Sequence, residues 1–384
     1  MPKIADSLNP EVRHMRRALV LAAKGEGFTS PNPMVGAVVV KRGKIIGEGW
    51  HHKAGEPHAE VLAIQDAKSK GHDITGATIY VTLEPCAHYH RTPPCVNLIA
   101  KEKLAKVVVA MADPNPEVSG HGIRWLRERG IEVTIGLLEE KAFHLNEPFV
   151  MRMLFGRPMV TLKAAISLDG RIATKSGDSK WISSLASRKY VHRLRGKSDA
   201  ILVGIGTVLA DDPQLTCRLV VNCKRQPLRV IVDSQIKIPL NAKVISEGLK
   251  GQTLIAVTSK APLEKRKKIE EMGVEIIVAD GTDGRVDLKS LLKILYEKGL
   301  NSVLLEGGSA LMTSMLAENL VDKVLLVLAP ILIGGKDSLP LIGGKGFEKV
   351  SDAIHLQKVH FRRFGDDLLV EGYLNQELYN CLPA

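Results

Sequence analysis

The chain has 384 residues, 45% of them hydrophobic and 25% charged, which is the composition of a soluble globular protein long enough for two domains. No apolar run reaches the ~18 residues of a membrane span and the N-terminal segment has no signal-peptide character, so we expect a cytoplasmic protein with no membrane partner. The net charge of +11 comes mostly from residues 151–384, which hold 34 basic against 25 acidic residues, whereas residues 1–150 hold 19 against 17. A nearly neutral first part argues against a nucleic-acid partner, and a basic second part suits small phosphorylated ligands.

The first expected elements are a helix and a hairpin. Asn9-Pro10 is typical of a helix start, and the apolar spacing that follows predicts a helix that ends near Gly25. The proline-rich segment 30–33 cannot be helical and leads into a strand over 35–40. A turn then begins a second strand over 44–49, which makes a hairpin.

A histidine, a glutamate and two cysteines follow in an order that predicts a metal site. Helical periodicity over 58–70 places His58 and Glu60 in the first turn of a helix. A strand over 78–82 delivers Cys86, and Cys95 follows after eight further residues. These side chains converge where a strand ends and helices begin, and the free backbone amides at helix N-termini favour an anion.

One imidazole and two thiolates leave the fourth tetrahedral position of a zinc ion open for water, which is typical of a catalytic site. Such water loses its proton near neutral pH, and Glu60 can carry the proton to a leaving amine. His-x-Glu followed by Pro-Cys-x-x-Cys is the signature of zinc deaminases that act on nucleobases, although the two cysteines here are further apart. A closed zinc knuckle completed by His88 or His90 stays open as an alternative, whereas a plain core histidine would leave Glu60 unexplained.

Alternating helices and strands complete the first part of the chain. They predict a three-layer α/β/α sheet that is largely parallel after the opening hairpin. The expected elements are a helix over 95–102, a strand over 106–110, a helix over 120–129 and a strand over 132–135. Gly156-Arg157-Pro158 follows a helix that ends near Met153. We therefore expect a domain boundary at about 150–157, between a first domain over 1–150 and a second over 151–384.

The second part alternates in the same way and predicts another α/β domain. Its expected strands cover 159–165, 200–204, 228–233, 253–257, 274–279, 302–305, 323–329 and 368–374, and its expected helices cover 184–195, 263–272, 288–298 and 310–318. Two segments, 204–207 and 306–309, place a glycine turn between a strand and a helix N-terminus, where backbone amides can bind an anion. Neither has a Gly-x-Gly-x-x-Gly fingerprint, so tight turns without a ligand remain an alternative on composition alone.

Three cysteines lie outside the expected metal site: Cys217, Cys223 and Cys381. Five cysteines are too few for a disulfide framework in so long a chain, and their number is odd. We therefore expect these three to be plain thiols.

The segment around the two metal-site cysteines resembles the deaminase half of the bifunctional riboflavin-biosynthesis deaminase/reductase family. The resemblance rests on Thr82-Leu83-Glu84-Pro85-Cys86-Ala87-His88 and on Arg91-Thr92-Pro93-Pro94-Cys95. It implies a cytidine-deaminase-like fold, with a substrate held by Asn32, His51, His88 and Arg91. His90 stands where the family usually has glycine and His121 where it has a basic residue. Either departure could alter the phosphate end of the pocket, but neither removes a metal ligand or Glu60.

The second part is similar to the reductase half of the same family, whose fold is similar to that of dihydrofolate reductase. The resemblance rests on the segments 162–173, 177–182, 210–216 and 306–308. By matching positions it implies that NADPH is held by Ala165, Trp181, Thr207, Asp211, Ser234, Gly308, Ser309, Ala310, Leu311, Met312, Thr313 and Ser314. It implies in the same way that the phosphorylated substrate is held by Ser179, Arg195, Leu215, Arg218 and Glu306. The guanidinium forks of Arg195 and Arg218 suit a phosphate. Ser234 follows a strand, where a small hydroxyl can accept a cofactor 2′-phosphate, whereas a carboxylate such as that of Asp233 beside it would repel one.

The resemblance implies two reactions in sequence. The first is the Zn2+-dependent deamination of 2,5-diamino-6-(5-phosphoribosylamino)pyrimidin-4(3H)-one. The second is the NADPH-dependent reduction of the ribosyl chain of 5-amino-6-(5-phosphoribosylamino)uracil to ribityl. It also implies a homo-oligomer, either a dimer or a tetramer.

Two other functions are conceivable. A deaminase of a cytidine nucleotide or a tRNA adenosine would need the short Cys-x-x-Cys loop and a basic surface beside the zinc, and this sequence lacks both. A zinc-stabilised nucleotide-binding regulator would bind zinc without releasing ammonia.

Overall fold

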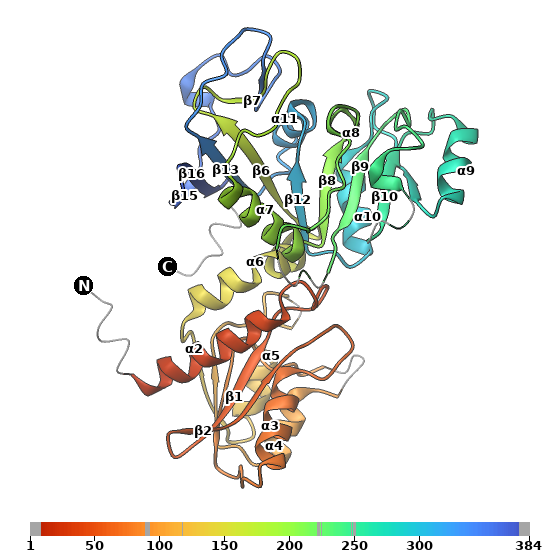
Figure 1. The fold of residues 1–384 in the computed structure, drawn as a ribbon. Helices are drawn as coiled ribbons and strands as arrows, with labels where there is room; N and C mark the ends of the chain where they lie inside the picture. The colour runs from red at the N-terminus through yellow and green to blue at the C-terminus, as the bar shows by residue number, and fades with distance from the viewer. Residues whose placement is uncertain are drawn as a thin grey trace. The chain divides into compact units, whose positions relative to one another are not determined.

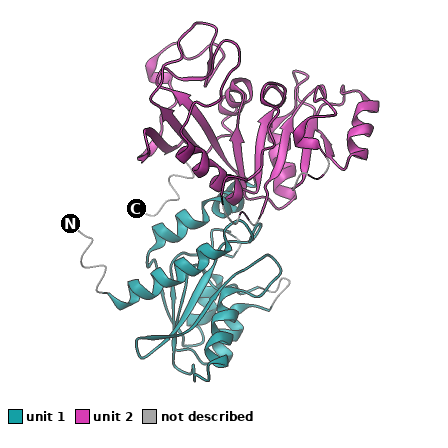
Figure 2. Ribbon diagram, viewed as in Figure 1, with its two compact units in different colours: residues 1–156, 382–384 teal, residues 157–381 magenta. Residues whose placement is uncertain are grey.

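The computed structural model describes residues 9–88, 93–116, 118–220, 223, 225–246, 248 and 251–375. The chain forms two compact units that divide between Gly156 and Arg157 (Figure 2). Within the described ranges, no helix is both long enough and apolar enough to cross a bilayer.

The first unit is built on a five-stranded sheet in the order β2-β1-β3-β4-β5 (Figure 1). β1 runs antiparallel to β2 and β3, whereas β3, β4 and β5 are parallel, as the alternating sequence pattern predicts. The strands are β1 (Gly36–Lys41), β2 (Lys44–Trp50), β3 (Thr78–Val81), β4 (Lys106–Val109) and β5 (Glu132–Ile135). The helices are α2 (Pro10–Ala22), α3 (Ala59–Ser69), α4 (Cys95–Lys101), α5 (His121–Arg127) and α6 (Glu139–Phe155).

Helices cover both faces of this sheet. α3, α4 and α5 pack on one face, where their buried side chains join Ile79 and Val81 of β3 in a single apolar cluster. Tyr80 points to the opposite face because successive strand residues alternate, and its ring lies 5.1 Å from that of His14 in α2. The expected three-layer α/β/α arrangement is therefore present.

Two glycines of β2 set how closely α3 approaches the sheet. A Cβ atom at Gly49 would lie 2.4 Å from the backbone N of Ala63, and one at Gly47 would lie 2.2 Å from the backbone O of the same residue. Only glycine permits this contact. The close approach fixes the N-terminal end of α3, where Glu60 follows the N-cap residue His58, against the hairpin.

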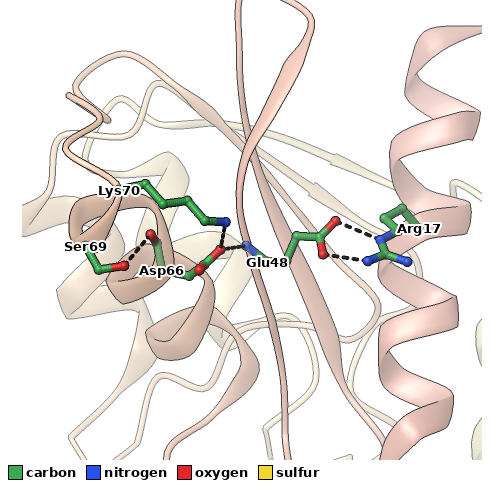
Figure 3. Close-up of polar contacts among 5 residues, drawn as sticks. All are labelled: Arg17, Glu48, Asp66, Ser69 and Lys70. Atoms are coloured by element: carbon green, nitrogen blue, oxygen red, sulfur yellow. Dashed lines mark hydrogen bonds and ion pairs between the residues drawn. The ribbon is translucent and has the colours of Figure 1, made fainter.

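A polar network on β2 ties the two neighbouring helices to the same strand (Figure 3). Arg17 of α2 donates two hydrogen bonds to the Glu48 carboxylate, at 2.7 and 2.6 Å. The backbone N–H of Glu48 donates to Asp66 of α3 at 2.8 Å, and Lys70 pairs with that same carboxylate. Arg17 holds the pKa of Glu48 below its usual value. Both α2 and α3 are therefore attached to the same strand of the hairpin, and this fixes the positions of the elements that surround the site.

The second unit contains a nine-stranded sheet in the order β11-β10-β9-β8-β12-β6-β13-β16-β15 (Figure 1). Neighbouring strands are parallel from β11 to β13. β16 runs antiparallel to both of its neighbours, β13 and β15. The strands of the sheet are β6 (Met159–Ser167), β8 (Ala200–Gly204), β9 (Leu228–Val232), β10 (Thr253–Val257), β11 (Glu275–Val278), β12 (Ser302–Glu306), β13 (Lys323–Ala329), β15 (Gln357–Phe364) and β16 (Asp367–Tyr373), while β7 (Arg171–Ala173) and β14 (Leu339–Pro340) form a separate pair.

Five helices cover the large sheet: α7 (Leu185–Lys197), α8 (Ile205–Asp211), α9 (Leu263–Glu271), α10 (Leu288–Glu297) and α11 (Ser309–Ala317). The side chains of α10 and α11 share one apolar cluster with alternate residues of the central strands. Those of α8 and α9, with Leu194 of α7, join the cluster on the other face. Because the central strands are parallel, the loops that follow β6, β8, β9 and β12 all leave the same edge of the sheet.

Candidate active sites

The first candidate site lies where β3 ends beside α3 and α4. His58 is the residue before α3, Cys86 follows β3 after a short loop, and Cys95 opens α4. The Nδ1 atom of His58 lies 3.2 Å from Cys95 Sγ and 3.5 Å from Cys86 Sγ. Their donor atoms all lie within 4.8 Å of one another, and no fourth side chain belongs to this group among the described residues.

These donors fit a zinc ion. With Zn–S of ~2.3 Å and Zn–N of ~2.0–2.1 Å, a tetrahedral centre separates its nitrogen and sulfur ligands by about 3.6 Å, close to the distances observed. Hydrogen bonding with Cys95, and then with His58, lowers the pKa of the Cys86 thiol to about 4 against the opposing effect of burial. A thiolate is therefore available as a ligand.

Glu60 is buried in the first turn of α3. Burial raises its pKa, while the charge of His58 acts in the opposite direction. Its carboxyl group also hydrogen-bonds with Cys95. A buried carboxyl with a raised pKa beside a metal site can both accept and donate a proton near neutral pH, which is what a general acid and base requires.

Asn32 and His51 lie on the approach to the same centre. His51 Nδ1 is 3.2 Å from the backbone O of Pro57, and its Nε2 is 3.0 Å from Asn32 Nδ2. Burial lowers the pKa of His51, so the ring is neutral. These contacts assign the proton to Nδ1, and the Asn32 amide then donates to Nε2. The ring of His51 meets that of His58 edge-on, with centroids 5.5 Å apart.

The loop that carries Asn32 is anchored by a residue that the sequence did not single out. Asn146 of α6 accepts a hydrogen bond from the backbone N of Met34 at 2.8 Å and donates to the backbone O of the same residue at 2.9 Å. Asn146 is buried and departs from helical backbone angles, two residues before Pro148. No local signal predicts this pairing, because the partners are 112 residues apart.

Glu84, two residues before Cys86, is a second residue that holds a loop of the site in place and that the sequence did not single out. Its buried carboxylate accepts four hydrogen bonds from described residues, all from backbone N–H groups: those of Asp113 (3.1 Å), Gly120 (2.9 Å), Gly122 (2.8 Å) and Ile123 (3.2 Å). Glu84 therefore closes the base of the loop after β4 and caps the N-terminus of α5. Asp113 in that loop is itself half-buried, and burial raises its pKa to about 6.

The other residues expected in this pocket are placed less completely. His88 is half-buried two residues after Cys86 and is not part of the donor group. Arg91 and His90 lie outside the described residues. His121, the first residue of α5, is exposed.

The second candidate site is a cavity of about 790 Å³ at the strand-end edge of the large sheet. All five expected substrate residues line it, as do most of the expected cofactor residues. Leu311 and Ser234 do not: Leu311 packs in the core, and the Ser234 hydroxyl accepts a hydrogen bond from the backbone N of Val286 at 3.1 Å.

An ion pair at the floor of the cavity changes the interpretation of Arg195. Its Nε and Nη2 atoms each donate to a different oxygen of Glu306 at 2.8 Å, so its fork is engaged by a carboxylate and not left for a phosphate. Burial would raise the pKa of Glu306, but Arg195 outweighs it and the pKa falls to about 2. Lys163 of β6, which the sequence did not single out, also lines the cavity, and burial lowers its pKa.

The segment that carries Arg218 is held in place by its neighbours. His192 Nδ1 accepts a hydrogen bond from the backbone N of Arg218 at 3.1 Å, and Arg195 donates to the backbone O of Thr216 at 3.3 Å. Burial lowers the pKa of His192 to about 4, and the charges of Arg195 and Arg218 lower it further.

The expectation that Cys217 and Cys223 are plain thiols is wrong, because they form a disulfide.

The cavity also fits a dinucleotide cofactor. Gly307 has a φ of +87°, and a Cβ atom there would lie 2.4 Å from the hydroxyl of Thr207. That hydroxyl is buried and has no hydrogen-bond partner among the described side chains and backbone. Glycine turns at the N-termini of α8 and α11 thus leave free donors facing the cavity, which is the arrangement that binds a pyrophosphate.

Family models match both parts of the chain. Residues 9–111 match the cytidine and deoxycytidylate deaminase zinc-binding region, and residues 158–370 match the RibD C-terminal domain. Together with the three-donor centre and the cavity, these matches define an enzyme that joins a zinc-binding deaminase domain to a reductase domain. The chain belongs to the RibD family of riboflavin biosynthesis proteins.

Full-length relatives support this assignment. The riboflavin biosynthesis protein RibD of Aquifex aeolicus is 44% identical over 93% of this chain and 96% of its own, and that of Bacillus amyloliquefaciens is 45% identical over 93% and 95%. The structure of Acinetobacter baumannii RibD aligns with a TM-score of 0.85 at 39% identity, covering 96% of this chain and 99% of that one. The Thermotoga maritima diaminohydroxyphosphoribosylaminopyrimidine deaminase/5-amino-6-(5-phosphoribosylamino)uracil reductase aligns with a TM-score of 0.84 at 39% identity, over 95% and 99%.

Proposed function

We propose that residues 9–156 deaminate 2,5-diamino-6-(5-phosphoribosylamino)pyrimidin-4(3H)-one. The observation that carries this proposal is the three-donor group of His58, Cys86 and Cys95 with the buried carboxyl of Glu60 beside it. Zinc held there would make water nucleophilic near neutral pH. Glu60 takes the proton of that water and passes it to the amine that leaves as ammonia.

The neighbouring side chains orient the pyrimidine. With His51 neutral and its Nε2 engaged by the Asn32 amide, the Asn32 carbonyl oxygen is left to accept from an amino group of the base. The loop closed by Glu84 carries Asp113, whose side chain accepts a hydrogen bond from the backbone N of Asn115 at 2.9 Å. His88 and Arg91 are the proposed contacts to the ribosyl phosphate.

We propose that residues 157–375 reduce the ribosyl chain of 5-amino-6-(5-phosphoribosylamino)uracil to ribityl. NADPH, when bound, supplies the hydride for C1′. The glycine turn of 307–308, Thr207 and the first turn of α11 hold its pyrophosphate, with Ala165, Trp181 and Asp211 as further cofactor contacts. Ser179, Leu215 and Arg218 bind the phosphorylated product of the first reaction.

Lys163 and Glu306 form the polar floor on which the ribose lies. Arg195 keeps Glu306 ionised, so this carboxylate accepts hydrogen bonds from sugar hydroxyls. Lys163 is the donor beside it. The two groups can therefore hold the ring-opened sugar with C1′ facing the cofactor.

One incubation tests both reactions. The full chain with zinc, NADPH and the diaminopyrimidine ribosyl phosphate is expected to release ammonia and to oxidise NADPH together. Glu60→Ala should release no ammonia yet still oxidise NADPH when the aminouracil product is supplied. Ammonia release by Glu60→Ala would remove Glu60 from the proposal, and deamination without NADPH oxidation would remove the second reaction.

We also propose that the enzyme acts in the cytoplasm as a homo-oligomer, a dimer or a tetramer. The edge strand β15 supports this, because Phe361 and Val359 are exposed on it beside an open sheet edge. Light scattering after size-exclusion chromatography would measure the mass, and a monomer at micromolar concentration would contradict the proposal.

A further inference from the structure

Arg285 reaches the reductase cavity from an unexpected direction. It lies in the loop between β11 and α10, yet its side chain lines the same cavity as Thr207, Gly307 and Gly308. The loop is attached to the end of β9, because Val286 N donates to Ser234 Oγ at 3.1 Å. Arg285 therefore enters beyond β9, whereas Glu306 enters at the end of β12.

The sheet order gives the position of Arg285 relative to the cofactor. β12, β8 and β9 are consecutive neighbours, so their ends are two strand spacings apart, roughly 10 Å. NADPH with its pyrophosphate held by the glycine turn after β12 would deliver its hydride on the β6 side, where Ala165 and Lys163 line the cavity. Its adenosine half would then extend the other way, towards β9 and Arg285.

The guanidinium of Arg285 is available to bind an anion. Its side chain is 74% exposed, and its ion pair with Asp283, which is 61% exposed, has a long N–O distance of 3.4 Å. Such a solvated pair is weak and readily exchanged for a phosphate, whose oxygens match the guanidinium fork. The backbone of Arg285 is meanwhile fixed by hydrogen bonds with Gly281 (2.8 Å) and Asp283 (3.1 Å).

The neighbouring charges agree with an anion at this position. Asp233 is fully buried and its Oδ2 atom accepts from the backbone N of Ile238 at 2.8 Å, so its carboxylate does not face the cavity. The ammonium of Lys260 lies beside Gly284, 3.7 Å from where a Cβ atom would be. At this end of the cavity the charged neighbours of Arg285 are therefore Lys260 and its exposed partner Asp283, and the carboxylates among the described residues that line the cavity are Asp211 and Glu306.

We infer that Arg285 binds the 2′-phosphate of NADPH and gives the reductase its preference for NADPH over NADH. This inference rests on the proposed reduction by residues 157–375. It assigns the charge recognition to Arg285, whereas the neutral hydroxyl of Ser234 holds the loop that carries it.

The test compares Arg285→Ala with Lys289→Ala in the full chain. Lys289 is an exposed cation four residues further on that does not line the cavity, so both variants lose one charge. Arg285→Ala is expected to raise KM for NADPH about tenfold and to leave KM for NADH unchanged. Lys289→Ala should change neither, and Arg285→Lys should fall between Arg285→Ala and the unsubstituted enzyme.

A binding measurement separates this inference from the proposed reaction. By titration calorimetry, Arg285→Ala should bind 2′,5′-ADP about tenfold more weakly and 5′-AMP as before. Equal changes for the two nucleotides, or for the two cofactors, would overturn the role of Arg285. Failure of the unsubstituted enzyme to oxidise NADPH, with this nucleotide difference intact, would instead overturn the proposed reaction.

Discussion

The carboxylate of Glu84 offers a sharp test of how the deaminase pocket is held together. It is buried, has no cationic partner among the described residues, and accepts four backbone hydrogen bonds from residues 113–123. Glu84→Ala would leave these amides without their acceptor beside the metal site. Glu84→Gln keeps one oxygen and therefore two of the four bonds.

The cost follows from these bonds. A hydrogen bond to a charged group contributes ~1.5–3 kcal/mol, but four bonds to one carboxylate are not additive, because some freed amides regain water. We expect Glu84→Ala to destabilise the first unit by about 3–5 kcal/mol, because each buried amide left without an acceptor costs ~1–3 kcal/mol, and Glu84→Gln by about half of that. With a urea m-value of ~1–3 kcal/mol/M, the alanine variant should lose its structure roughly 1–5 M earlier.

The two activities provide the assay. Ammonia release after incubation in increasing urea reports the first unit, and NADPH oxidation with the aminouracil product reports the second. Glu84→Ala should shift only the first midpoint, and Glu128→Ala, which removes an exposed carboxylate of the same unit, should shift neither. If ammonia release from Glu84→Ala fails at the same urea concentration as in the unsubstituted enzyme, the loop is not held by Glu84.

Three further outcomes are expected. Removal of zinc by a chelator should stop ammonia release but leave NADPH oxidation intact when the aminouracil product is supplied, and loss of that oxidation would contradict separate sites. Asp322→Ala should lower the stability of the second unit by about 3–5 kcal/mol in urea unfolding, because this buried carboxylate accepts from Arg157 (2.8 and 2.7 Å) and from the backbone N of Val160 (2.8 Å); an unchanged midpoint would contradict it. In the folded chain the pKa of His192 is lowered to about 4, so as pH falls the unfolded chain takes up a proton before the folded chain does. The free energy of unfolding, which is fully present above about pH 6.5, should therefore decline by about 1–2 kcal/mol at pH 5. In His192→Asn, whose amide oxygen can replace the Nδ1 acceptor, this pH dependence should be weaker in the same urea measurement, and an equal slope would contradict it.

The residues of the metal centre were predictable because their signal is local. His58 and Glu60 are two apart, and Cys86 follows a strand whose β-branched and aromatic side chains mark it clearly. Strands such as β8, which is buried along nearly its whole length, were predicted for the same reason. Hydrophobic pattern and motif spacing are properties of adjacent residues.

What the sequence did not reveal depends on partners far along the chain. Glu84 and Asn146 look like ordinary polar residues until the fold brings amides to them. Arg195 resembles a phosphate ligand, and only its pairing with Glu306, 111 residues away, shows that its fork is engaged. β15 has mostly exposed side chains and an apolar alternation of only two residues, Val359 and Phe361, so its pairing with β16 decides its structure. Cys217 and Cys223 form a disulfide that cysteine counting did not predict.

The two hydrogen bonds between Asn146 and the backbone of Met34 have a practical consequence for the production of the deaminase half alone. The matched deaminase segment stops at residue 111, and a gene fragment cut there would encode neither α5 nor α6. Such a fragment would keep all three metal donors and Glu60 yet leave the Asn32 loop untethered. A fragment that continues to Phe155 retains the tether, and comparison of the two would distinguish zinc retention from turnover.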